Sequence, residues 1–181
     1  MRFRAIPIPG LILVWLLMAG PGRAQDAQPT EYQLKAALIF NFAKFVEWPP
    51  AAFADAASPI VIGILGDNPF DEALARTVRG KAINNRPLVV QEFRSASEAT
   101  NCHVLFICNS EKKRLPEILK SLQGTRALTV GETDRFTESG GMINFFEEGK
   151  KIRFQINLDA ARSAGLKVSS RLLGIASHPT R

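Results

Sequence analysis

The fold of this chain is decided by the stretch TEYQLKAALIFNFAKFVEWPP, residues 30–50. Thr30 is followed three residues later by Gln33, the form of a capping box, which predicts that a helix begins there. Apolar residues spread over most of the helix circumference and leave only a narrow polar stripe. The large aromatic side chains are Phe40, Phe42, Phe45 and Trp48. Because the double proline cannot continue a helix, we predict one long core helix that ends there and is covered by the rest of the chain.

The first 24 residues resemble a secretory signal peptide. Arg2 and Arg4 precede an apolar run, and small residues follow it up to Ala24. The run is about half as long as a membrane-spanning helix, so cleavage after Ala24 is expected rather than an uncleaved anchor. We therefore predict a periplasmic protein with a signal peptide over 1–24, a flexible N-terminus over 25–30, an α/β domain over 31–176 and a frayed tail over 177–181.

The charge of the chain gives no indication of nucleic-acid binding. The formal net charge is +6, and it falls to +3 when the three arginines of the first 24 residues leave. The densest basic run, Lys112–Arg114, is not interleaved with aromatic residues. A nucleic-acid footprint requires a larger basic surface, so no nucleic acid is expected among the partners.

Alternating strand and helix signals follow the double proline. Apolar runs of strand length lie at 59–66, 87–93, 102–108 and 127–131. Asn68 and Pro69 predict a helix start after the first run, and Gly80 predicts its end. A second helix is predicted over 110–123. Strands joined by helices in this way form right-handed parallel crossovers, so we expect the four strands in the order second, first, third, fourth.

The pattern changes after residue 140. Residues 142–146 and 151–156 are separated by a polar turn, which predicts an antiparallel hairpin. A short helix is predicted from Asn157 to Gly165, and residues 169–176 could be helix or strand. The predicted fold is a single α/β domain. It has a small, largely parallel sheet flanked by helices, with the C-terminal hairpin at its edge.

The side chains that usually perform catalysis are sparse and isolated. Cys102 and Cys108 lie at the two ends of one predicted strand, roughly 20 Å apart, so they cannot bond to each other. Buried thiols and a bond to another chain both remain open. His103 lies in the same strand and is interpreted as a hydrogen-bonded core histidine. No nucleophile–base pair and no metal-ligand spacing is found, so we predict no enzyme, no metal and no cofactor.

Polar residues follow three of the predicted parallel strands. In an open sheet, ligands bind at the carboxyl ends of the strands where the strand order reverses. The candidate ligand or partner rim, called here the strand-end rim, consists of Asp67, Asn68, Asn109, Ser110, Glu132, Asp134 and Arg135. A glycine-assisted tight turn explains the first part of it equally well. The segment lacks the glycine spacing of a phosphate loop, and Asp67 would repel phosphate.

Several blocks together resemble the YfiR/HmsC family of periplasmic regulators. They are KAALIFNFAKFVEWP, GILGDNPF, CHVLFI and the long block that begins LTVGETDRF and continues through INLDAAR to SSRLLGIA. The resemblance covers residues 31–176, and the last block is the most specific. It implies no catalytic residues that could be carried over.

The resemblance also implies a function and partners. Such a protein would be exported, often homodimeric, and would bind and repress the periplasmic sensing region of an inner-membrane diguanylate cyclase. It would thereby lower cyclic di-GMP and biofilm formation, and an outer-membrane lipoprotein would sequester it in some systems. The alternative from another class is a periplasmic small-molecule binding module that uses the crevice at the strand-end rim.

Overall fold

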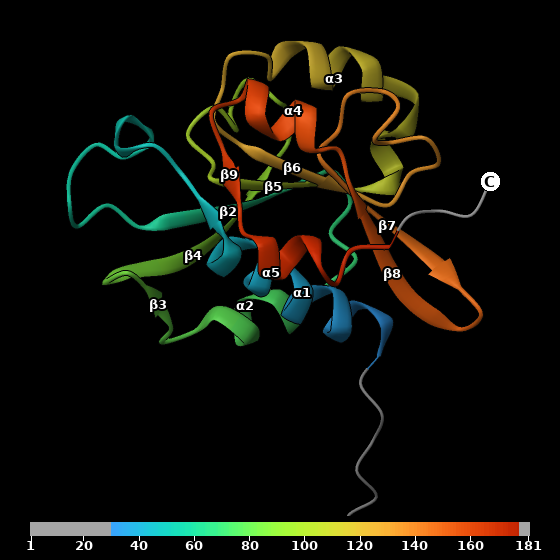
Figure 1. Ribbon diagram of the computed structural model, residues 1–181, viewed down its shortest axis with the longest axis horizontal. Coiled ribbons are helices and arrows are strands. Elements are labelled where there is room, and N and C mark those ends of the chain that lie inside the picture. The colour runs from blue at the N-terminus through green and yellow to red at the C-terminus, as the bar shows by residue number, and fades with distance from the viewer. Residues whose placement is uncertain (1–29, 178–181) are drawn as a thin grey trace, which may run out of the picture.

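The computed structural model describes residues 30–177, and Figure 1 shows its arrangement. The predicted signal peptide, its cleavage site at Ala24 and the residues after 177 lie outside this part of the chain. A seven-stranded sheet with the order β3-β4-β2-β5-β6-β7-β8 forms the centre. Its strands are β2 (Ile60–Leu65), β3 (Ala82–Ile83), β4 (Arg86–Phe93), β5 (Val104–Ile107), β6 (Leu128–Gly131), β7 (Ile143–Glu148) and β8 (Lys151–Ile156).

The sheet is largely parallel. Strands β4, β2, β5, β6 and β7 pair in parallel, while β7 and β8 form the antiparallel hairpin at one edge and β3 adds a short antiparallel strand at the other. The order β4-β2-β5-β6 is the predicted order of second, first, third and fourth strand. The prediction of an α/β fold with an edge hairpin is therefore confirmed.

Helices cover both faces of the sheet. They are α1 (Glu31–Phe45), α2 (Ala73–Val78), α3 (Leu115–Ser121), α4 (Leu158–Ser163) and α5 (Ser170–Leu173). Figure 1 shows α1, α2 and α5 on one side and α3 on the other. The first side buries the larger core, around Phe42, Phe70 and Phe106, and the second buries a smaller core around Phe136.

The organising helix begins as predicted but ends earlier. The Thr30 side chain accepts a hydrogen bond from the Gln33 N–H, and the Gln33 side chain accepts one from the Thr30 N–H. The helix ends at Phe45, not at the prolines. Residues 46–47 instead form the strand β1 (Val46–Glu47), which pairs antiparallel with β9 (Lys167–Val168) in a separate two-stranded sheet. The partner strand β9 comes from the C-terminal part of the chain, so no local sequence signal predicts the early end of the helix.

The helix that follows the first parallel strand, α2, begins later than predicted. The Asn68 side chain accepts a hydrogen bond from the Phe70 N–H at 2.8 Å, which makes a turn rather than a helix cap. Asp71 then has a φ of +48°, outside the helical region, and α2 begins only at Ala73. The predicted helix start at Asn68 is therefore wrong, because a local side-chain bond competes there with the helix.

The C-terminal elements follow the sequence signals. The Asn157 side chain accepts from the Ala160 N–H and caps α4, and Gly165, with a φ of +76°, follows its end. Ser169 caps α5, the element that the sequence left unassigned. Among the described helices, none is long and apolar enough to cross a membrane.

Candidate functional site

The strand-end rim is assembled at one edge of the sheet. Leu65, Ile107 and Gly131 are aligned neighbours at the ends of β2, β5 and β6. The loops that follow these strands therefore leave the sheet side by side and bring the predicted rim residues to one edge. The reversal of strand order lies between β2 and β5, as predicted.

Close packing fills the point where the crevice was expected. Gly66 has a φ of +99°, and a Cβ atom there would lie 2.5 Å from the Ser110 Oγ. The Asp67 N–H donates to the same Ser110 oxygen at 3.0 Å. The loops after β2 and β5 thus contact each other directly, and glycine is required because no side chain would fit. This geometry favours the interpretation of the segment as a tight turn.

Asn68 is also engaged within the protein. Its side-chain amide donates to a Glu92 carboxylate oxygen at 2.6 Å, while its oxygen accepts from the Phe70 N–H. The bond to Glu92 ties the loop after β2 to the end of β4. Both the nitrogen and the oxygen of the Asn68 amide are therefore engaged in holding this loop, which is a structural role.

Glu132 belongs to a buried polar cluster that sequence reasoning missed. Its carboxylate accepts from the Tyr32 hydroxyl at 3.2 Å and from the Lys35 Nζ at 2.5 Å, and Lys35 also pairs with Glu31. The side chains of Lys35 and Glu132 are only 6% and 11% exposed. The sequence signal was the spacing of Glu31 and Lys35 on one helix face. It did not point to Glu132, which is 97 residues away from Lys35.

The cluster changes the proton affinities of its members. Burial alone would lower the pKa of Lys35, but its hydrogen bonds to Glu132 and Glu31 outweigh burial and raise it. Burial raises the pKa of Tyr32, and the adjacent Glu132 charge adds to this effect. Lys35 is therefore held as a cation and Tyr32 as a neutral hydroxyl. A cation locked in place by two carboxylates anchors α1 to the loop after β6.

The remaining rim residues face solvent. Asp67, Asn109, Asp134 and Arg135 are exposed. Arg135 has a φ of +59°, and its guanidinium bonds to Glu138 at 2.6 Å in a pair that is open to water. Of the seven predicted residues, the structure thus engages Asn68, Ser110 and Glu132 internally and leaves the other four as a polar surface.

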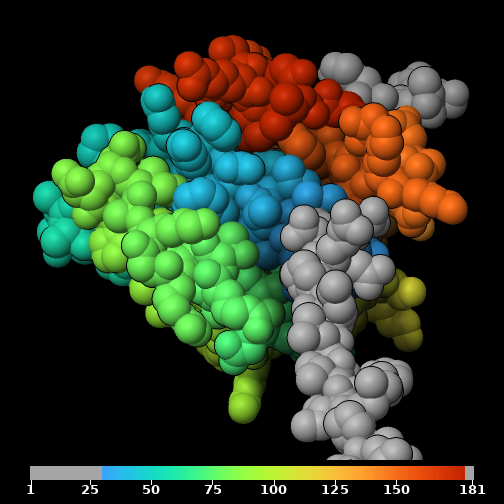
Figure 2. Space-filling view, turned by 90° about the horizontal axis from the view of Figure 1, so that it is seen from below, coloured from blue at the N-terminus to red at the C-terminus, as the bar shows by residue number. Residues whose placement is uncertain are grey.

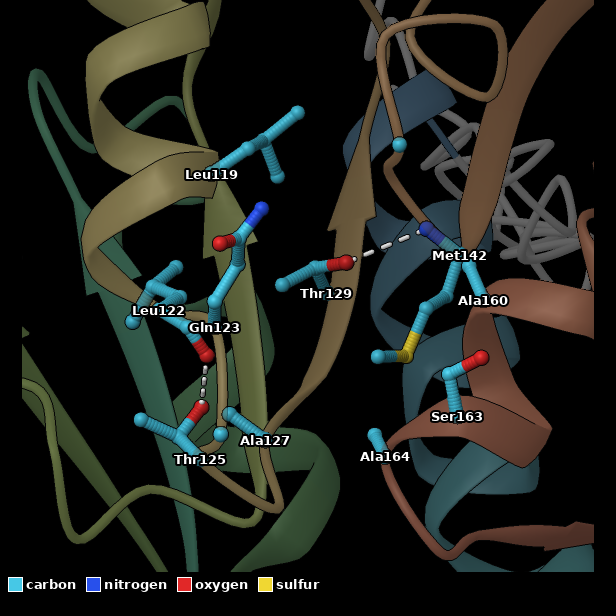
Figure 3. Close-up of a pocket in the computed structure, with 12 residues that line it drawn as sticks. Leu119, Leu122, Gln123, Thr125, Ala127, Thr129, Met142, Ala160, Ser163 and Ala164 are labelled. Carbon is cyan, nitrogen blue, oxygen red and sulfur yellow. Dashed lines mark hydrogen bonds between the residues drawn. The ribbon is translucent and has the colours of Figure 1, made fainter.

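An apolar cavity lies elsewhere, between the end of α3 and the later part of α4 (Figure 3). It has a volume of about 320 Å³. The Thr129 Oγ1 on its wall accepts from the Met142 N–H at 3.1 Å, and the Thr125 hydroxyl donates to the Leu122 carbonyl at 2.7 Å. No acidic, basic or thiol side chain lines it. The cavity therefore offers hydroxyl groups, at Thr125, Thr129 and Ser163, but no acidic or basic side chain that could activate one of them as a nucleophile.

His103 lies at the amino ends of the strands, opposite to the strand-end rim, and aromatic side chains pack over its ring. Its ring stacks on Phe53, with ring centroids 4.4 Å apart, and Phe53 is in turn covered by the Arg86 guanidinium at 3.8 Å. The His103 Nδ1 accepts from the Val61 N–H at 3.1 Å, which places the proton of the neutral ring on Nε2. The Trp48 indole donates to the His103 carbonyl at 3.1 Å.

Only part of the prediction for His103 is confirmed. The residue is buried as expected, but its Nε2 makes no well-formed hydrogen bond to any described residue. Burial has the largest effect on the pKa of His103 and lowers it; the nearby backbone of Ala52 opposes this, and the Arg86 charge lowers the pKa further. Arg86 also donates to the carbonyls of Asp55 and Ser58 and so holds the loop over the histidine.

The burial of neutral His103 predicts a loss of stability in acid. A histidine with a lowered pKa in the native state binds more protons when unfolded. The melting temperature should therefore fall as the pH drops below the unfolded value of about 6.5. His103→Asn keeps an oxygen for the Val61 N–H but does not titrate there, so its melting temperature should fall less between pH 7.5 and pH 5.5. If the melting temperatures of the two proteins fell equally between pH 7.5 and pH 5.5, this role of His103 would be contradicted.

Cys102 and Cys108 are both buried, and they are not bonded to each other. Their burial favours the interpretation as buried thiols over a bond to another chain. Burial raises the pKa of Cys102 to about 12. Burial and nearby carboxylates raise the pKa of Cys108 to about 12 as well. Both thiols are therefore protonated at neutral pH and do not act as nucleophiles. Within residues 30–177, no three histidine, cysteine or acidic side chains gather as they would around a metal ion.

Comparison with protein families gives a match over most of the chain. A family model described as YfiR/HmsC-like matches residues 32–177.

One solved structure shows a similar fold at low sequence identity. A conserved domain protein from Vibrio cholerae O1 biovar El Tor strain N16961 is 13% identical, with a TM-score of 0.54, and the match covers 82% of this chain and 60% of that one. An ABC domain from Streptococcus pneumonia, solved in complex with L-Trp, is 14% identical with a TM-score of 0.49, and the match covers 81% and 59%. The chain thus spans about three fifths of the length of these two proteins.

Proposed function

The chain belongs to the YfiR/HmsC-like family, and on this premise we propose that it is a periplasmic, non-enzymatic regulator of an inner-membrane diguanylate cyclase. It binds the periplasmic sensing region of the cyclase and represses it, which lowers cyclic di-GMP and biofilm formation. An outer-membrane lipoprotein that sequesters the regulator, and a homodimeric state, are further parts of this proposal. The match over residues 32–177 is the observation that supports it most directly.

The geometry of the strand-end rim agrees with binding of a protein. Exposed charged and amide side chains at Asp67, Asn109, Asp134 and Arg135 form a polar surface of the kind found around protein interfaces. The alternative, a small-molecule module at the crevice, is less well supported, because Gly66 and Ser110 pack against each other at the point where a ligand would lie.

Repression of this kind needs no chemistry. A protein that binds only the inactive conformation of the cyclase lowers the active fraction by its differential affinity for the two states. Each tenfold reduction requires about 1.4 kcal/mol of that difference. Tight packing of the regulator against one conformation is sufficient.

Deletion of the gene is expected to raise cellular cyclic di-GMP, because a cyclase loses its repressor. The nucleotide is measured in cell extracts of the parent, the deletion strain and complemented strains. The full chain should restore the low level, and a version without residues 1–24 should not. An unchanged level in the deletion strain, with every native cyclase present, would contradict the proposed function.

A pair of charge reversals then tests the rim. Arg135→Glu should weaken repression without changing the thermal melt. Arg79→Glu is the matched control, because Arg79 is a similarly exposed partner of an ion pair, with Glu72, and follows the end of α2 rather than one of the parallel strands. Equal repression by the two variants would exclude Arg135 from the contact surface.

A further inference from the structure

Strand β8 forms an open edge of the sheet. It pairs with β7 on one side, and β7 and β8 are joined by a tight turn at Gly149 and Lys150. An edge strand presents a row of backbone N–H and C=O groups that another extended chain can pair with. The direction of these groups along β8 follows from two hydrogen bonds.

The first bond is made by the Asn157 N–H, which donates to the Met142 carbonyl and so faces β7. The second is made by the Ser177 N–H, which donates to the Phe154 carbonyl at 2.8 Å from the outer side. Along an antiparallel strand, the backbone N–H and C=O groups of successive residues point alternately toward the partner strand and away from it. The backbone groups of Ile152, Phe154 and Ile156 therefore all point away from β7. Among the described residues, only Ser177 hydrogen-bonds to this row.

A groove of about 510 Å³ follows the same edge beyond Ser177. On one face of the sheet its wall includes Gln155, whose amide donates to the Thr137 hydroxyl at 2.8 Å. On the other face it includes Ile156, Leu173 and Ala176. Side chains from both faces thus border the outward backbone of Ile156. Figure 2 shows the hairpin, in orange, bordered by the C-terminal segment, in red.

The groove has exposed apolar side chains at its border. Leu173, which lines the groove, is 36% exposed, and Ile175, two residues further along the chain, is 57% exposed. Apolar side chains at a strand edge supply the pockets that receive alternate residues of an added strand. The surface therefore combines an outward backbone at Ile156, beyond the bond between Ser177 and Phe154, with an apolar groove.

We propose that the edge of β8 and this groove bind an extended segment of the regulated partner protein by strand addition. The inference rests on the proposed function and names its contact surface. The segment pairs with the backbone of Ile156 and places apolar side chains at alternate positions against Leu173 and Ala176. The groove adjoins the strand-end rim, because Glu138, which bonds to Arg135, also lines it.

The observations favour an extended segment of another protein over other occupants. A helix has no free backbone groups that could match those of a strand edge. Two copies of β8 could pair about a two-fold axis. The Ser177 of each copy, however, already lies against Phe154 near the middle of the strand. A partner segment that enters at Ile156 leaves that bond intact.

The test exploits the outward direction of the Ile156 N–H. Ile156→Pro removes this donor without removing a bond of the β7–β8 ladder, since proline is tolerated on edge strands at such positions. Ile156→Val is the matched control, because it keeps the N–H and a branched side chain. In the deletion strain, Ile156→Val should restore the low cyclic di-GMP level, and Ile156→Pro should leave it as high as in the deletion.

Two further measurements make the result decisive. Leu173→Glu alters the groove without touching the backbone and should also lose repression, with a thermal melt close to that of the parent. A photo-crosslinking amino acid in place of Leu173 should form an adduct with a membrane cyclase in cells, and Ile156→Pro should abolish it. Full repression by both variants, or an adduct of twice the mass of this chain alone, would overturn strand addition. A deletion that leaves cyclic di-GMP unchanged would instead reject the proposed function itself.

Discussion

Phe42→Ala is expected to lower the free energy of unfolding by about 3–5 kcal/mol, the cost of removing a buried phenylalanine. Phe42 has no exposed surface, and it packs against Phe145 and Phe154 with ring centroids 5.5 and 4.9 Å apart. Alanine would leave a cavity between α1 and the β7–β8 hairpin. The melting temperature should fall by about 10 °C, since each kcal/mol shifts it by roughly 2–4 °C in a domain of this size.

Phe45→Ala is the control for this prediction. Phe45 lies at the end of the same helix but is only partly buried, so its removal should cost about 1–2 kcal/mol. Both substitutions introduce alanine, which is a better helix former than phenylalanine, so a larger loss for Phe42→Ala reports the loss of core packing. If the melting temperature fell equally in the two variants, the full burial of Phe42 would add no stability, and the prediction would be contradicted.

Lys35→Met is expected to destabilise the protein by about 3 kcal/mol, because the buried Glu132 side chain would lose its cationic partner. The Tyr32 hydroxyl would then be its remaining side-chain partner. We expect the lower end of the usual range for a broken buried pair, since Glu31, the third member, is half exposed. Thermal or urea unfolding measures the effect.

The double variant Lys35→Met/Glu132→Leu should recover most of this loss, because two apolar side chains replace the ion pair without leaving a charge. An exposed pair provides the comparison: Arg79→Met, which breaks the pair with Glu72, should cost less than about 1 kcal/mol. A double variant that is less stable than Lys35→Met would show that the carboxylate stabilises the fold by itself.

Local signals in the sequence predicted the features that depend on near neighbours. Thr30 and Gln33 gave the start of α1, and four apolar runs of strand length gave the order of the parallel strands. These predictions are correct because helix capping and crossover handedness depend on short stretches of chain. The hairpin at Gly149 and Lys150 follows for the same reason.

Features that depend on distant residues were not predicted. The end of α1 at Phe45 requires β9, which follows more than one hundred residues later. The position of Glu132 at the rim was predicted, but its bond to Lys35 was not, because no periodicity relates the first helix to the loop after β6. At the rim itself, the strand order indicated a crevice, but it could not indicate that the loops after β2 and β5 contact each other at Gly66 and Ser110.

The pairing of β1 with β9 also constrains how the chain can fold. The first helix leads directly into β1, and the Ser169 N–H donates to the Phe45 carbonyl. The organising helix therefore acquires some of its partners only when the last part of the chain is present. Such contacts between distant segments close a long loop, which slows folding. Until that closure, the apolar face of the helix stays open to aggregation, so the newly made chain depends on rapid completion of its C-terminal end.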